Sequence, residues 1–170
     1  MFGKYGDAIK LPFGILVVLL IVNFVLGIIG AFVGAIPVIN VAGGILSLLW
    51  LGIMALITIA VYIWMGYNAK TNLGFAWTDS LIAGFIVSIP YEILHFLGTF
   101  LLTIIGAALG GVSTTLGSDD KAVGMLVGGI GAMIGVGFGT AMALLVAIVG
   151  IILGPILTLL GHLLGKVLSK

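Results

Sequence analysis

Long apolar stretches separated by short polar breaks dominate the chain. The first apolar run extends from about residue 13 to 34 and the second from about 41 to 67. A third run covers about 80–105 and a fourth about 123–153. In each run an α-helix, at ~1.5 Å per residue, is long enough to cross a hydrocarbon layer of ~30 Å. The pattern therefore predicts an all-α, polytopic integral membrane protein with a four-span helical bundle.

The last stretch, about 155–169, has apolar and polar residues on opposite faces of a helix. Thr158, His162 and Lys166 share the polar face. Such a pattern is typical of an amphipathic helix that lies in the headgroup plane of a bilayer. We therefore expect a C-terminal interfacial helix, with Lys166, Lys170 and His162 in contact with lipid headgroups. The alternative is a last helix that packs on a neighbouring helix.

Charges are few, and their positions predict an orientation. The chain has six lysines and no arginine against five acidic residues, for a net charge of +1. With four spans, one side of the membrane receives five of the lysines: Lys4, Lys10, Lys70, Lys166 and Lys170. A five-span alternative, with a turn near Gly139, divides them equally. Because cytoplasmic segments carry the excess of lysine, four spans with both termini on the cytoplasmic side of the cell membrane are favoured.

Composition excludes several classes of protein. Of the 170 residues, 62% are apolar and only 6% are charged, whereas soluble domains average about 25% charged residues. A soluble enzyme and a nucleic-acid-binding protein are therefore excluded. No catalytic arrangement, phosphate loop or metal-binding cluster is evident, so we expect no enzymatic activity, cofactor or metal. We also expect the N-terminal segment to be retained and residues 1–170 to form a single membrane domain.

Glycine supplies 28 residues and falls at helical spacing in two of the spans. The residues of this pattern are Gly27, Gly30 and Gly34 in the first span and Gly124, Gly128, Gly131, Gly135 and Gly139 in the fourth. Small residues let helices approach closely in lipid, where the hydrophobic effect does not drive association. The pattern predicts helix-packing faces, used within one chain or between copies.

A polar line crosses the third span. Ser88, Glu92, His95 and Thr99 are three or four residues apart and therefore share one face. Glu92 lies about 18 Å from the start of the span, close to the middle of the bilayer. Further polar residues at a comparable depth are Asn23, Thr58 and Thr140. We expect a buried polar layer in which Asn23 hydrogen-bonds Glu92.

Two functions follow as expectations. The first is a small structural or accessory membrane protein, acting through glycine-mediated packing with other membrane subunits or with copies of itself. The second is a proton- or cation-linked transporter or channel subunit that uses Glu92 and His95, since ionisable groups inside membranes are functional candidates. Other interpretations stay open: a structural hydrogen-bond layer, a metal or haem site, a lipid or small-molecule cavity, and membrane shaping by the tail.

Overall fold

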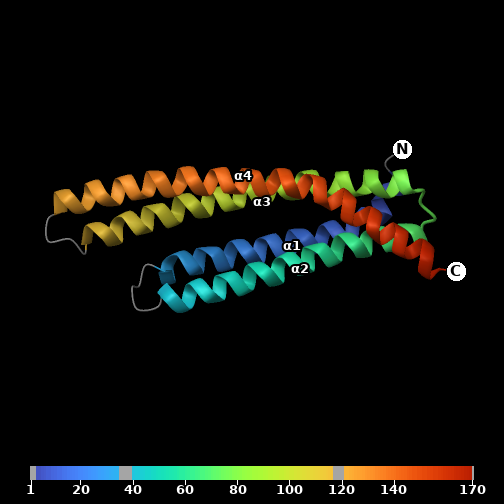
Figure 1. Ribbon diagram of the computed structural model, residues 1–170, viewed down its shortest axis with the longest axis horizontal. Helices are drawn as coiled ribbons and strands as arrows, with labels where there is room; N and C mark the ends of the chain where they lie inside the picture. Colours follow the sequence, from blue (N-terminus) through green and yellow to red (C-terminus); the bar gives the residue numbers. More distant parts are fainter. Residues whose placement is uncertain (1–2, 35–39, 117–120, 170) are drawn as a thin grey trace. The chain divides into compact units, whose positions relative to one another are not determined.

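The computed structural model describes residues 3–34, 40–116 and 121–169, and within these ranges it consists of helices without strands (Figure 1). The helices are α1 (Gly3–Gly34), α2 (Asn40–Thr71), α3 (Trp77–Leu116) and α4 (Lys121–Leu168). All four are long and apolar enough to cross a membrane. The predicted all-α, four-helix membrane bundle is therefore confirmed.

The helices extend beyond the apolar runs that predicted them. α1 begins at Gly3 and contains Pro12, and α3 ends only at Leu116. An apolar run marks the part of a helix that lipid can cover, whereas backbone hydrogen bonding continues into polar flanks. α4 is continuous through both Gly139 and Pro155. The five-span alternative is therefore wrong, and the tail is the last part of α4 rather than a separate helix.

The chain divides into two compact units, each built from parts of all four helices. The first unit comprises Met1–Leu20, Leu51–His95 and Val146–Lys170, and the second comprises Ile21–Trp50 and Phe96–Leu145. Each unit has its own contacts and is described separately. The single domain expected from the sequence stays a prediction.

The core of the first unit is a cluster of large apolar side chains. Its buried members come from α1, α2 and α3: Leu16, Val61, Tyr62, Met65, Val87 and Tyr91. The C-terminal part of α4 completes this unit and crosses α2, as Figure 1 shows in red. There the contact is between backbones, because a Cβ atom placed on Gly66 of α2 would overlap the Thr158 carbonyl of α4. Glycine is therefore what permits this crossing.

A tight turn joins α2 to α3 in the same unit. Gly74 has a φ of 63°, a left-handed conformation that glycine adopts without steric cost. The Ala76 amide donates a hydrogen bond to Asp79 Oδ2 at 3.4 Å, so Asp79 reaches back to cap the start of α3. Tyr5 of α1 donates to the other oxygen of Asp79 at 3.0 Å and packs edge-on against Phe75. These contacts fix the beginning of α1 against the turn.

In the second unit, α3 contacts both α1 and α4. A Cβ atom on Gly27 of α1 would lie 2.5 Å from a methyl carbon of Leu102, and one on Gly139 of α4 would lie 2.7 Å from the Thr103 methyl carbon. α1 and α2 are joined by a hydrogen bond from Trp50 Nε1 to Asn23 Oδ1 at 3.1 Å. The close approaches at Gly27 and Gly139 show that part of the predicted glycine pattern serves packing within the chain.

Candidate functional site: a buried polar cluster around Glu92

Glu92 lies inside the first unit, on α3, with only 5% of its surface exposed. Its carboxylate packs against α4 at Gly150, where a Cβ atom would collide with the carboxylate group. A glycine at this position thus makes the space that the carboxylate occupies. Two residues earlier, Pro90 has no amide hydrogen to donate within the helix, which leaves the Ile86 carbonyl without its usual helical partner. The surroundings of Glu92 therefore combine a buried carboxylate with locally weakened helical hydrogen bonding.

His95 is the nearest basic partner of this carboxylate. Its Nδ1 atom lies 3.5 Å from Glu92 Oε2, at the long limit of a hydrogen bond. The His95 side chain is 32% exposed, and its ring stacks on Tyr91 with centroids 6.0 Å apart. The imidazole therefore connects a buried carboxylate with the outer surface of the first unit. Two residues that the sequence places on one face of α3 are therefore in contact.

Two tyrosines border the same carboxylate. Tyr62 of α2 is 2% exposed, and its hydroxyl has no hydrogen-bond partner among the described residues. The side chain of Tyr91 is hydrogen-bonded to that of Thr58, and both tyrosines lie close enough to Glu92 to interact with its charge. A buried hydroxyl without a partner is costly, and it marks a place where a water molecule or ion would be stabilised.

Ser88 extends the cluster by one helical turn. It is fully buried, and its hydroxyl donates to the Ile151 carbonyl of α4 at 3.3 Å. A Cβ atom on Gly154 would lie 2.7 Å from the Ser88 Cβ atom and 3.0 Å from the Tyr62 ring. Gly150 and Gly154 of α4 therefore seat the polar side chains that α2 and α3 contribute.

The predicted polar layer is distributed over both units. Ser88, Glu92, His95 and Thr58 lie in the first unit, whereas Asn23, Thr99 and Thr140 belong to the second. Asn23 accepts its hydrogen bond from Trp50, the Thr99 carbonyl accepts one from Thr103 at 2.8 Å, and the buried Thr140 hydroxyl has no described partner. The expected bond between Asn23 and Glu92 stays a prediction.

Three members of the cluster were not predicted from the sequence: Tyr62, Tyr91 and Gly150. Tyr62 lies near the end of the second apolar run, where tyrosines are common at a membrane surface, but it is one of the largest fully buried side chains. Its spacing of four residues from both Thr58 and Gly66 places it on their face and was the available signal. Among the described residues, no three histidine or acidic side chains gather as a metal site would require.

The tail of α4 turns its polar face toward the protein, whereas the sequence predicted that this face points to lipid headgroups. His162 is only 4% exposed, and its Nδ1 atom lies 2.8 Å from Ser80 Oγ, so it packs inward rather than facing lipid headgroups as the sequence predicted. Thr158 is fully buried as well, whereas Leu163 and Leu164 are each 48% exposed. Lys166 is exposed, as expected, and Lys170 lies outside the described residues. The polar face packs inward because it also carries Gly161 and Gly165, which contact α2.

The predicted glycine faces are only partly filled by the chain. Gly124 and Gly128 are buried, but a Cβ atom on Gly30, Gly131 or Gly135 would meet nothing within 4 Å. The packing of Gly34 is outside the described contacts. In the second unit, α3 and α4 border an open groove of about 490 Å³ whose lining includes Gly106, Gly110, Gly128, Gly131 and Gly135.

Comparison of the chain with protein-family models, with curated proteins and with solved structures found no match.

Proposed function

We propose that the protein is a small structural or accessory membrane subunit, rather than an enzyme, and that it acts through glycine-mediated helix packing. The glycine-lined groove of the second unit carries this proposal. An exposed glycine within a helix costs about 1 kcal/mol relative to alanine. Gly131 and Gly135 are exposed and have free space above them, so the chain alone gains nothing from them. A helix of another subunit or of a second copy, packed closely on this groove, would offset that cost.

The oligomeric state in lipid tests this function. Replacing both Gly131 and Gly135 by leucine fills the groove, and we expect the assembly formed by the wild type in nanodiscs to be weakened at least tenfold. Native mass spectrometry of the released protein measures this loss. The matched control replaces Gly129 and Gly137 by leucine, because these glycines are also exposed on α4 but do not line the groove. A wild type that is strictly monomeric and without partners contradicts the proposal, and so does equal disruption by the control.

A second candidate function is a proton- or cation-linked path through Glu92 and His95. The observation that favours it is the buried carboxylate within 3.5 Å of a partly exposed imidazole, beside the Tyr62 hydroxyl, which has no partner among the residues that the structure describes. A carboxyl group and an imidazole in contact can exchange a proton, and water at the tyrosine would extend the path. In this candidate, Glu92 holds the proton inside the first unit, and His95 passes it to the surface of that unit.

Proton flux into liposomes tests the second candidate. Glu92→Gln keeps the size and polarity of the side chain but removes its titration, so flux measured with a pH-sensitive dye should fall at least tenfold. Asp7→Asn makes the same chemical change at an exposed carboxylate of α1 and should leave the flux unchanged. Equal flux through the wild type and Glu92→Gln contradicts this function and leaves a structural role for the cluster.

The membrane that holds the protein, and the side on which its two termini lie, are part of the same proposal. Four apolar helices support a place in a membrane, and we propose the cell membrane with both termini cytoplasmic. The support is the distribution of lysine, because Lys10, Lys70 and Lys166 all belong to the first unit together with both ends of the chain.

A further inference from the structure

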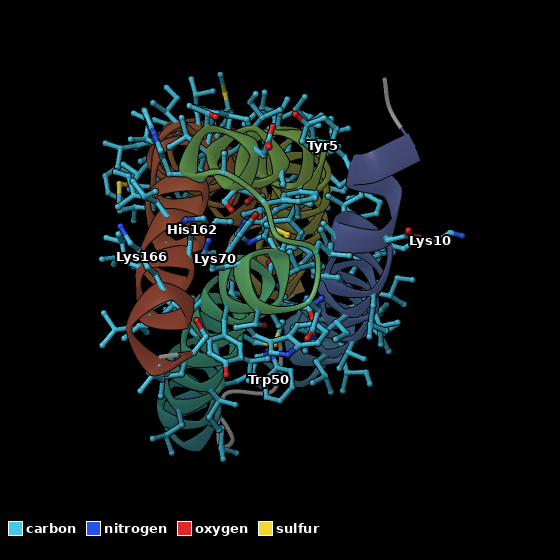
Figure 2. The ribbon with its side chains drawn as sticks, turned by 90° about the vertical axis from the view of Figure 1, so that its right-hand side faces the viewer. Tyr5, Lys10, Trp50, Lys70, His162 and Lys166 are labelled. Carbon is cyan, nitrogen blue, oxygen red and sulfur yellow. The ribbon has the colours of Figure 1, made fainter. Side chains whose placement is uncertain are left out.

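Two lysines of the first unit converge beside His162. Lys70 is in the last turn of α2 and Lys166 in the last turn of α4. A Cβ atom on Gly165 would lie 3.1 Å from the Lys70 Cβ atom, so the stem of Lys70 packs on the helix that carries Lys166. Both ammonium groups are close enough to act electrostatically on His162. Figure 2 shows the three side chains together, with Lys10 pointing away from them.

The imidazole of His162 is held in one place by Ser80. The Ser80 hydroxyl, which is fully buried, lies 2.8 Å from Nδ1. The other ring nitrogen, Nε2, makes no hydrogen bond within the described part of the chain. When Ser80 donates to Nδ1, Nε2 carries the proton and is a donor. The imidazole is thus a fixed, inward-packed group beside the two flexible ammonium groups.

No carboxylate neutralises these lysines in the described part of the chain. The ion pair found there joins His95 and Glu92, and Asp79 is engaged by Tyr5 and by the Ala76 amide. Two uncompensated ammonium groups that both lie beside one imidazole attract an anion. The adjoining surface of α4 is apolar, because Leu163, Leu164 and Val167 are 48%, 48% and 68% exposed. An anion that also carries a long hydrocarbon chain would contact both the ammonium groups and this apolar surface.

We propose that Lys70 and Lys166, beside the buried His162, form a binding site for the phosphate group of an anionic phospholipid. The two ammonium groups hold the phosphate oxygens. The acyl chains lie along the exposed leucines of α4. The site is independent of the groove of the second unit and of the cluster around Glu92.

Lipid retention by the full chain tests this site. Nanodiscs of phosphatidylcholine with a rising fraction of phosphatidylglycerol supply the lipid, and native mass spectrometry counts the phosphatidylglycerol that stays bound after release. Lys70→Met and Lys166→Met keep an apolar stem but remove the charge. Each should weaken retention at least about fivefold, because a lysine near an anionic lipid surface contributes about 1 kcal/mol. Lys10→Met removes the same charge from an exposed position on α1 and should have no effect.

Two results with the variants would overturn the proposal. Equal retention by all three variants and the wild type would mean that the lysines only complement the carbonyl ends of α2 and α4. An equal loss in all three, Lys10→Met included, would mean attraction by overall charge. A competition arm identifies the source of the phosphate: inorganic phosphate at millimolar concentration should not displace the lipid, and complete displacement would make free phosphate the ligand instead.

Discussion

A methyl group is the whole difference between glycine and alanine, and at several contacts of the first unit there is no space for it. A Cβ atom on Gly66 would overlap the Thr158 carbonyl, and one on Gly161 would overlap the Ile63 carbonyl. Both neighbours are backbone atoms, so no side-chain rotation relieves the overlap. In lipid, such close approach is itself a source of helix association.

We therefore expect Gly66→Ala to destabilise the protein by about 1–3 kcal/mol, the usual cost of overpacking, even though alanine favours a helix by about 1 kcal/mol. Gly52→Ala, on the same helix but with nothing within 4 Å, should be neutral or stabilising by up to about 1 kcal/mol. Unfolding by SDS in mixed micelles, followed by circular dichroism, compares the two variants. Equal stability would show that α2 and α4 do not rely on this approach.

The burial of Glu92 was predictable, whereas its companions were not. A charged group in an apolar helix must turn toward protein or water, and the spacing of His95 indicated its partner. Tyr62 gave no comparable signal, since a tyrosine at the end of an apolar run is common at a membrane surface. Gly150 was missed because its role depends on a carboxylate of another helix, and spacing along one helix does not reveal it.

α4 shows why an amphipathic pattern has two solutions in a membrane. The polar face can point to headgroups with the apolar face in lipid below, or it can point into the protein with the apolar face in lipid around it. The spacing of apolar residues is the same in both cases. The distinguishing feature is the set of glycines on the polar face, Gly154, Gly161 and Gly165, because small residues belong at helix contacts. The prediction of an interfacial helix did not take these glycines into account.

The number of spans followed from the apolar runs alone, because a membrane requires uninterrupted helical hydrogen bonding over a known length. The division into two units did not, since each unit gathers segments from all four helices that are distant in sequence. Orientation depends on a different property, the position of charge. Lys70 lies in the last turn of α2 and Lys166 in the last turn of α4, so we expect the two crossings by α3 and α4 to bring both lysines to one side.

Cysteine labelling tests this orientation directly, because the natural chain has no cysteine. Asn72→Cys in the turn between α2 and α3 and Ser169→Cys after α4 should react with a membrane-impermeant maleimide only after cells are permeabilised. Ser118→Cys, between α3 and α4 in sequence, should react in intact cells. The reverse pattern would place the termini outside, and labelling of Asn72 and Ser169 from different sides would contradict four spans.

The length of α4 has a consequence for the membrane that holds it. Its apolar part, Ala122–Leu168, has 47 residues and a contour length of about 70 Å. Even at a tilt of 40°, the upper end of the usual range, a hydrocarbon layer of ~30 Å covers only about 26 residues of a helix. The remainder creates a hydrophobic mismatch, which bilayer thickening or contact with neighbouring proteins reduces. Thick bilayers are therefore the favourable environment for this chain, and thin ones should drive it into clusters.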